Sequence, residues 1–411
     1  MSGESLLFAK RSHLGEKASG LESQNINPIT EIALGFQVSE GLLLSPNAER
    51  VYLGGLDGNV HSIRFDDNGD PVDSIFEISS STSQDGGRKS RRAIQDQRKH
   101  KAPIKVIDGV FEGGGLSKLI SLDRAGVLSE WKVEGEAVKY TAANFIDWTI
   151  GADIKLLPGG QIIFVSPLTG QVDSVSFDNA GNLKSEFSVG FVNSKGRRKS
   201  IHSAAVSDDS NELSFDIALA DGDANVAVMR LSMDEDGKTK SEVVHEIRNT
   251  SFIGMSSESL FDTKTISFPP EKINFINNRL MLVCCGDGVL MNIRQDDNTW
   301  KQEVIKCGLE GKDPGLGEPV SAQKTQDDRV VVAYKHGVVK LWEKCGDMWI
   351  SKDLQEGFMQ GELMDMRIVG NKFVVTSNQY SGESSSGYIT IGEIPSLSND
   401  PLLLTGSIYT D

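Results

Sequence analysis

Residues Asp327–Lys344 read DDRVVVAYKHGVVKLWEK, and this stretch decides the fold. The β-branched run between Arg329 and Tyr334 suits a strand with one buried face. The sequence KHG that follows is typical of a tight turn, because Gly337 accepts the positive φ that such turns need. A second apolar run then ends on the aromatic Trp342. The stretch therefore predicts a β-hairpin, and similar hairpins recur along the chain.

A complete repeating unit is visible at Gly41–Ile78. Four short strands are expected in it, at Leu42–Ser45, Arg50–Gly54, Asn59–Phe65 and Val72–Ile78. The turns between them contain Pro, Asn, Asp and Gly, which are the residues that turns favour. Four antiparallel strands joined in this way form one blade of a β-propeller.

Six further units repeat this pattern, so the chain is expected to form seven blades. These units are Lys105–Phe145, Asp153–Phe191, Ile201–Ile247, Lys272–Gly308, Pro319–Phe358 and Leu363–Tyr409. Each unit has a glycine expected in its central turn: Gly58, Gly126, Gly170, Gly222, Gly288, Gly337 and Gly387. The predicted fold class is all-β, a seven-bladed propeller of four-stranded antiparallel blades with almost no helix.

The domain organisation follows from the repeats. Residues 1–37 form an N-terminal arm, and residues 38–411 form the propeller, with inserts at about 79–103 and 250–270. The segment Pro28–Phe36 resembles the fourth strand of a blade but has no blade of its own. An open ring would expose two strand edges. We therefore expect this segment to close the ring by pairing with the last blade, beside Leu402–Tyr409.

Two residue types at fixed places in the units indicate a family. Aspartate occupies the turn between the second and third strands at Asp57, Asp123, Asp221 and Asp287. Tryptophan closes the third strand at Trp131 and Trp342. With these features the units resemble WD-repeat β-propellers. The resemblance implies that the aspartates hold their turns by accepting hydrogen bonds from backbone N–H groups, and that the tryptophans are buried between neighbouring blades.

The units also depart from the WD-repeat pattern. None contains the Gly-His dipeptide that opens a WD repeat, and only Asp123 and Trp131 occur in the same unit. Thr169-Gly170 and Ser386-Gly387 replace the turn aspartate in two units. The chain is therefore either a divergent member of this family or a propeller of another repeat family.

No residue pattern in the chain indicates a metal, a cofactor or a catalytic centre. The four cysteines lack the paired spacing of a zinc site, and they are expected to be buried, reduced thiols. The six histidines are scattered at His13, His61, His100, His202, His245 and His336, and structural or surface roles are expected for them. The glycine-rich Glu112–Gly115 lacks the strand-to-helix context of a phosphate-binding loop. Asp234–Gly237 is not followed by the ligand pattern of a calcium loop.

Two basic segments interrupt this acidic chain, whose net charge is −16. The first contains Arg88, Lys89, Arg91, Arg92, Arg98, Lys99 and Lys101, and the second contains Lys195, Arg197, Arg198 and Lys199. Each follows the fourth strand of its unit, so both are expected on the same face of the propeller. Three interpretations stay open for them: solvated loops, a site for an anionic partner, or a nuclear import signal.

The favoured function is that of a non-catalytic scaffold or adaptor within a larger complex. It would dock protein or ribonucleoprotein partners on its faces, with RNA or another polyanion at the basic segments. The sequence has no apolar run of signal-peptide or membrane-span length. An intracellular location, cytoplasmic or nuclear, is therefore expected, and no small-molecule substrate.

Two alternatives belong to other functional classes. One is a propeller enzyme, such as a lactonase-like hydrolase, with its site in the central channel. That site needs polar groups on the first strands of the blades, whereas Leu42–Ser45, Lys105–Asp108, Ile273–Ile276 and Met366–Val369 are mostly apolar. The other is a nucleic-acid-binding subunit of a ribonucleoprotein, for which binding should fall steeply with added salt.

Overall fold

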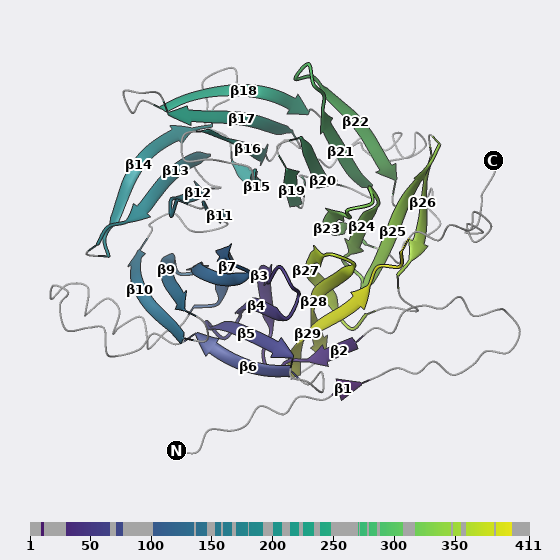
Figure 1. The fold of residues 1–411 in the computed structure, drawn as a ribbon, viewed down its shortest axis with the longest axis horizontal. Coiled ribbons are helices and arrows are strands. Elements are labelled where there is room, and N and C mark those ends of the chain that lie inside the picture. Colours follow the sequence, from purple (N-terminus) through teal and green to yellow (C-terminus); the bar gives the residue numbers. More distant parts are fainter. Residues whose placement is uncertain are drawn as a thin grey trace, which may run out of the picture.

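Seven antiparallel sheets surround a common centre in the structure of the protein, a computed structural model (Figure 1). The structure describes residues 10–11, 30–65, 71–76, 102–134, 137–145, 153–157, 159–166, 170–179, 181–191, 200–207, 214–221, 225–233, 239–247, 270, 272–277, 279–285, 288–306, 317–346, 348–354, 359–381 and 384–396. These residues form strands and turns and include no helix. The predicted fold, an all-β seven-bladed propeller, is confirmed.

Consecutive strands within a blade are hydrogen-bonded neighbours, and the first strand of each blade lies nearest the centre (Figure 1). Blade 1 consists of β3 (Val38–Leu44), β4 (Arg50–Gly55), β5 (Val60–Phe65) and β6 (Pro71–Phe76). Blade 2 consists of β7 (Ile104–Glu112), β8 (Gly115–Asp123), β9 (Val127–Glu134) and β10 (Ala137–Phe145). Blade 3 consists of β11 (Asp153–Leu156), β12 (Ile162–Ser166), β13 (Gln171–Phe177) and β14 (Leu183–Gly190).

The next three blades repeat this order. Blade 4 consists of β15 (Ile201–Val206), β16 (Ser214–Asp221), β17 (Val226–Met233) and β18 (Thr239–Ile247). Blade 5 consists of β19 (Lys272–Asn277), β20 (Leu280–Cys285), β21 (Gly288–Arg294) and β22 (Trp300–Lys306). Blade 6 consists of β23 (Pro319–Lys324), β24 (Val330–Tyr334), β25 (Val338–Cys345) and β26 (Met348–Asp353).

Blade 7 combines strands from both ends of the described chain. It contains β27 (Glu362–Val369), β28 (Lys372–Ser381) and β29 (Ser384–Glu393), followed by β2 (Thr30–Ala33) and the two-residue β1 (Lys10–Arg11). In Figure 1 the purple N-terminal strands lie beside the yellow β29. The N-terminal segment thus pairs with the last blade, as expected. The prediction that this segment lies beside Leu402–Tyr409 was wrong, because β2 lies between β29 and β1. Leu402–Tyr409 itself lies outside the described residues.

The chain beyond β2 continues this closure. Leu34 N donates to the Gly387 carbonyl at 2.8 Å, and Gly387 N donates to the Phe36 carbonyl at 2.9 Å. The Asn378 side chain accepts from Val38 N at 2.9 Å and donates to the Val38 carbonyl at 2.8 Å. This buried amide therefore attaches the start of blade 1 to blade 7.

Six of the seven predicted central-turn glycines are described and fall into two groups, whereas Gly222 lies outside the described residues. Gly58, Gly126, Gly170 and Gly337 have positive φ, between 61° and 93°, as expected of turn residues. Two predicted turn glycines were wrong: Gly288 is the first residue of β21, and Gly387 is paired within β29. A Cβ atom on Gly387 would lie 2.5 Å from the Phe36 carbonyl oxygen. Gly387 is thus required by the close approach of the ring-closing backbone rather than by a turn.

The hydrophobic core consists of clusters that join neighbouring blades. Cys284 and Cys285 show this arrangement, because successive strand residues point to opposite faces. Cys284 packs with blade 6 residues such as Trp342, whereas Cys285 packs with blade 4 residues such as Val226. The expectation of buried thiols fails for Cys345, which is exposed.

Both predicted tryptophans are buried between blades. Trp131 is 4% exposed and lies against Phe76 of blade 1. Trp342 is 6% exposed, and its Nε1 donates to the Tyr334 hydroxyl at 3.2 Å. The large rings thus fill space between neighbouring sheets.

No helix able to span a membrane occurs among the residues described.

Replacing Trp342 with alanine should destabilise the propeller by about 3–5 kcal/mol. The substitution leaves a cavity between blades 5 and 6 and removes the hydrogen bond from Trp342 Nε1 to the Tyr334 hydroxyl, and large core truncations cost this much. Urea unfolding of the variant and the parent protein measures the loss. A loss below about 1 kcal/mol would contradict the inter-blade packing described for this ring.

Replacing Gly387 with alanine should lower the melting temperature through a clash at the closure. The added methyl group meets backbone atoms of Phe36 and Val38, which cannot move without parting the two chain ends. Gly190→Ala is the matched control, because that strand glycine has open space around its Cβ position. Removal of residues 1–37 should destabilise the whole domain still further. Equal melting temperatures for the two alanine variants would show that the closure tolerates the methyl group.

Candidate functional site: the central channel

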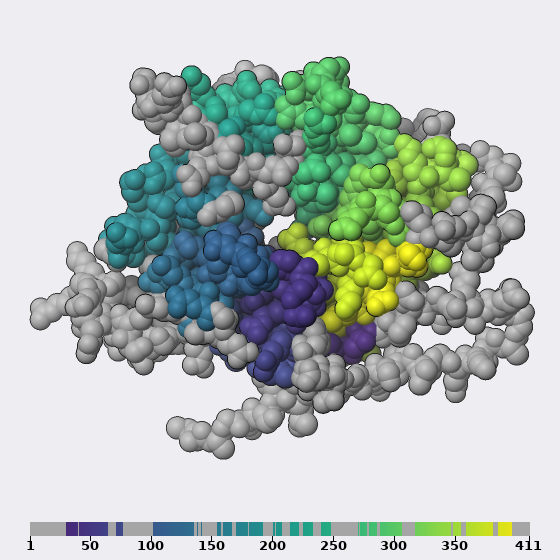
Figure 2. Space-filling model, viewed as in Figure 1, coloured from purple at the N-terminus to yellow at the C-terminus, as the bar shows by residue number. Residues whose placement is uncertain are grey.

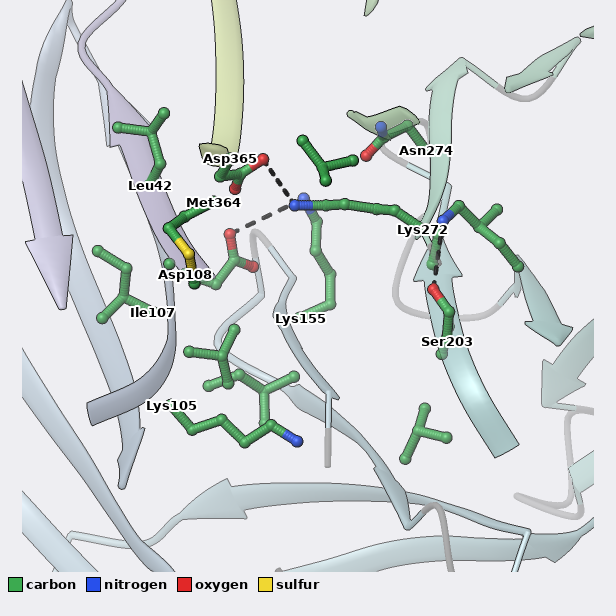
Figure 3. Close-up of a pocket in the computed structure, with 18 of the residues that line it drawn as sticks. Leu42, Lys105, Ile107, Asp108, Lys155, Ser203, Lys272, Asn274, Met364 and Asp365 are labelled. Carbon is green, nitrogen blue, oxygen red and sulfur yellow. Dashed lines mark hydrogen bonds and ion pairs between the residues drawn. The ribbon is translucent and has the colours of Figure 1, made fainter. Parts of the chain in front are cut away.

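A channel of about 470 Å³ runs through the centre of the ring and is lined by residues of all seven blades. The space-filling view is hollowed at this place (Figure 2). Its walls are formed mainly by the seven innermost strands, β3, β7, β11, β15, β19, β23 and β27. Figure 3 shows how the charged side chains of these strands point into it. It is a concavity to which every blade contributes lining residues, and so we take it as the candidate site.

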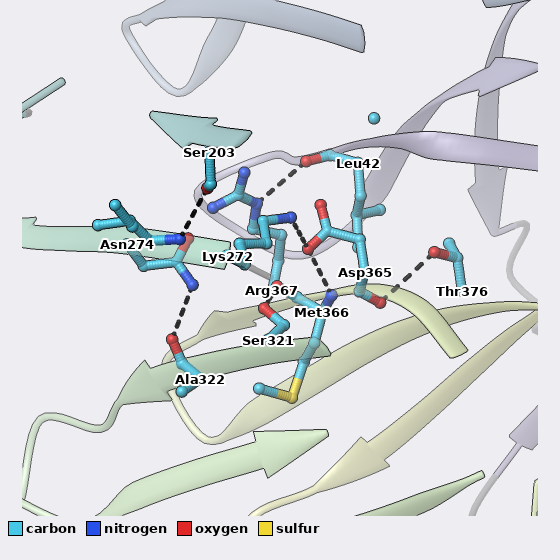
Figure 4. Close-up of polar contacts among 12 residues, drawn as sticks. Leu42, Ser203, Lys272, Asn274, Ser321, Ala322, Asp365, Met366, Arg367 and Thr376 are labelled. Carbon is cyan, nitrogen blue, oxygen red and sulfur yellow. Dashed lines mark hydrogen bonds and ion pairs between the residues drawn. The ribbon is translucent and has the colours of Figure 1, made fainter. Parts of the chain in front are cut away.

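A short ion pair in the channel joins blade 5 to blade 7. Lys272 Nζ lies 2.6 Å from Asp365 Oδ1 (Figures 3 and 4). Lys272 is the first residue of β19 and Asp365 lies in β27, so the ion pair connects two blades that are separated by blade 6. The same carboxylate oxygen also accepts from Met366 N at 2.8 Å. The Asp365 side chain is 1% exposed, whereas that of Lys272 is 24% exposed.

A second ion pair joins blades 2 and 3. Lys155 Nζ lies 3.9 Å from Asp108 Oδ1, and Leu156 N donates to Asp108 Oδ2 at 2.6 Å. Burial raises the pKa of Asp108, although the charge of Lys155, the N–H of Leu156 and the charge of Arg367 act in the opposite direction. Asp108 is thus a recessed carboxyl group in the wall, with two cationic side chains on its channel side.

Hydrogen bonds between neighbouring inner strands complete the wall (Figure 4). Arg367 Nε donates to the Leu42 carbonyl at 3.1 Å, which joins blade 7 to blade 1. Asn274 Nδ2 donates to the Ala322 carbonyl at 3.0 Å, and the Ser203 hydroxyl accepts from Ile273 N at 3.2 Å. Ser321 Oγ donates to the Met366 carbonyl at 3.4 Å. Side chains of the channel therefore fix the blades to one another.

The channel is more polar than the sequence suggested. The first strands are largely apolar, as expected, but their charged residues face the channel, among them Lys105, Lys155, Lys272, Asp365 and Arg367. Charged residues inside otherwise apolar strands were the signal that sequence reasoning missed. The pairing of Lys272 with Asp365 could not be predicted, because it depends on how blades 5 and 7 face each other.

Lysine, arginine and carboxylate side chains are the charged groups that line the channel among the described residues. The described lining residues include no histidine or cysteine, and the carboxylates of Asp108 and Asp365 are engaged with lysines. No group of three His, Cys, Asp or Glu residues able to hold a metal ion is found among the described residues. The arrangement suits electrostatic binding of a charged molecule and attachment of the blades to one another.

The turn aspartates lie away from the channel and have the geometry that the family resemblance implies. Asp57 accepts from Asn59 N, Asp123 accepts from Ala125 N and Val127 N, and Asp221 accepts from Asn225 N, all at 2.8–3.0 Å. They form no carboxylate ring, because each closes its own turn. Asp287 lies outside the described residues.

Other sequence features are structural where they are described. Glu112–Gly115 contains the turn between β7 and β8, in which Gly113 and Gly114 have positive φ. Asp297 closes the turn before β22 by accepting from Thr299 N at 2.9 Å. The Asp234–Gly237 segment lies outside the described residues, as do all the predicted anion-binding residues: Arg88, Lys89, Arg91, Arg92, Arg98, Lys99, Lys101, Lys195, Arg197, Arg198 and Lys199.

The histidines that the structure describes have separate surroundings. His336 is exposed in its turn, and His245 stacks on Trp300 with ring centroids 4.9 Å apart. His61 is 1% exposed and stacks on Phe36 at 3.5 Å, within the ring-closing segment. Its Nδ1 lies 3.0 Å from Asp73, and its Nε2 lies 3.2 Å from Asp57. His13 and His100, and the side chain of His202, are not described.

The surroundings of His61 change the pKa of two groups. Burial lowers the pKa of His61, but hydrogen bonds to Asp57 and Asp73 outweigh it and raise the pKa above the ordinary 6.5. Burial raises the pKa of Asp57, but hydrogen bonds from His61 and Asn59 lower it to about 2. The charged imidazolium is therefore favoured beside the closure.

No protein-family model matches the sequence, and no curated protein matches it. Among solved structures, the β-propeller domain of Cps50 (Swd1) from Myceliophteria thermophila is similar, with a TM-score of 0.59 and 10% sequence identity. The match covers 89% of this chain and 100% of that domain. The resemblance to WD-repeat propellers is thereby confirmed at the level of the fold. With 1002 matching chains, the fold does not by itself specify a function.

The stability of the propeller should fall as the pH rises through the pKa of His61. Because the folded-state pKa lies above the unfolded value of 6.5, this contribution is complete below about pH 6.5 and is lost above the raised pKa. Urea unfolding at about pH 6 and about pH 9 should show a loss for the parent protein that His61→Gln lacks. His245→Gln is the control, because burial lowers the pKa of His245, and its contribution to stability therefore has the opposite pH dependence. Parallel pH profiles for the parent protein and His61→Gln would contradict the assignment.

Proposed function

We propose that this protein is a non-catalytic scaffold that docks other proteins on the faces of its propeller. The observation that supports this most is the closed and braced ring, in which inner strands of neighbouring blades are joined by side-chain hydrogen bonds and ion pairs. Such a frame holds the loops around a disc in fixed relative positions, and loops on a rigid frame are common binding elements. The fold similarity to the Cps50 (Swd1) propeller domain is compatible with this function.

The basic segments supply the chemistry of one partner surface. The segment 88–101 follows β6 and precedes β7, and the segment 195–199 follows β14 and precedes β15. Both therefore connect an outer strand to the next inner strand. Four antiparallel strands per blade bring all such connections to one face, which supports a shared surface. Lysine and arginine on this surface would bind an acidic protein segment, with arginine able to hold a carboxylate by two parallel hydrogen bonds.

Reversing four charges in these segments should weaken partner binding without unfolding the protein. The variant is Arg91→Glu, Arg92→Glu, Arg197→Glu and Arg198→Glu together. Its matched control reverses four exposed lysines on the blades, Lys132, Lys240, Lys352 and Lys372. Quantitative capture of partners from native lysate, at low and moderate salt, compares both with the parent protein. We expect the first variant alone to lose partners, and the loss to be largest at low salt.

The outcomes separate the remaining interpretations. Capture that is equal for all three proteins at both salts would show that the basic segments are solvated loops. Capture that disappears after nuclease treatment and falls steeply with salt would instead indicate nucleic acid as the partner. Retained partners combined with a loss of nuclear accumulation would indicate an import signal.

A further inference from the structure

We propose that the central channel is a binding site for a small phosphate-bearing anion, held by Lys155, Lys272 and Arg367. The site lies within the ring and does not involve the basic segments of the proposed docking surface. Its position and charge follow from how deeply each charged group of the channel is buried.

The lysines of the two ion pairs lie closer to the channel space than the carboxylates do. The Lys155 and Lys272 side chains are 31% and 24% exposed, whereas those of Asp108 and Asp365 are 10% and 1% exposed. The carboxylates are thus recessed in the wall and hold the lysines from behind (Figure 3). At these two pairs a molecule inside the channel therefore meets ammonium groups first. The charged lining residues as a whole are five cations and four carboxylates, an excess of one positive charge in a chain whose net charge is −16: Lys105, Lys155, Lys272, Lys335 and Arg367 against Asp108, Glu318, Glu362 and Asp365.

Arg367 adds a third cation to the lining of the channel. It lies two residues after Asp365 in β27, so both side chains point to the same face of the strand. Its Nε is fixed by the Leu42 carbonyl, and its two terminal nitrogens make no hydrogen bond to the part of the chain that the structure describes. Its charge also acts on Asp108. Arg367 thereby links the two ion pairs into one cluster.

These cations indicate the chemistry of the ligand. A guanidinium fork held through Nε offers parallel N–H donors that match two phosphate oxygens, and lysines bind phosphate as point charges. Surrounding protein of low dielectric strengthens these interactions relative to water. The channel volume of about 470 Å³ falls in the range of about 300–1,000 Å³ that small-molecule sites occupy. A phosphate or diphosphate compound of metabolite size therefore suits both the charge and the volume.

The test is calorimetric titration of the full chain with inorganic phosphate, with pyrophosphate and with glucose as the uncharged control. We expect pyrophosphate to bind more tightly than phosphate, glucose not to bind, and binding to weaken with added salt. Lys272→Gln and Arg367→Gln should each lower the affinity about tenfold or more, because each removes a charge-assisted hydrogen bond. Lys132→Gln in β9 and Lys352→Gln in β26, two exposed residues away from the channel lining, should leave it unchanged.

Two further variants keep the test decisive if a channel substitution harms folding. In Lys155→Gln the Asp108 carboxylate keeps its hydrogen bond from Leu156 N, so the contact between blades 2 and 3 is retained. One cation of the channel is lost, and the affinity for the anion should therefore fall. Asp365→Asn replaces the carboxylate with an uncharged amide of nearly the same shape, so the affinity for the anion should rise. Thermal melts establish that each variant is folded. The proposal is overturned if the parent protein binds neither anion at millimolar concentration, or if folded channel variants bind as tightly as the parent.

Discussion

Pairing between β2 and β29 joins two segments that lie at opposite ends of the described chain, and the circular arrangement depends on it. Without it, blade 7 would contain only three strands and β29 would expose an unpaired edge. The Asn378 side chain continues the junction by bonding both backbone groups of Val38, 340 positions away. Because every blade packs against two neighbours, a strain at this junction reaches the core on both sides.

Local sequence patterns predicted the blades well, because each blade is built from neighbouring segments. Turn residues such as Gly58 and Gly126 need only their own φ angles, and the aspartates bond backbone groups at most four residues away. Trp131 and Trp342 were recognised because an aromatic residue at the end of a third strand has a large area to bury. The fold class and the number of blades could therefore be predicted from the sequence.

The candidate site could not be predicted in this way. Lys272 and Asp365 belong to blades 5 and 7, and nothing near either residue indicates the other. Gly387 was interpreted as a turn residue. In a sequence, a glycine required by a close backbone approach cannot be distinguished from a glycine required by a turn, and the backbone that approaches Gly387 comes from the other end of the described chain. Prediction thus failed where contacts cross from blade to blade. The channel charges are also the residues that distinguish this ring from a purely apolar scaffold.

The shared construction of blade 7 has a consequence for biosynthesis. A ribosome releases β2 before blades 1 to 6, whereas its partner β29 is released after all of them. Blades 1 to 6 contain only consecutive strands, so each can form as it emerges. During that time the N-terminal strand lacks its native neighbour, and contacts between distant segments form slowly. The nascent protein is therefore an open arc with two exposed edges until β29 emerges, and it is most susceptible to aggregation or chaperone capture during that interval.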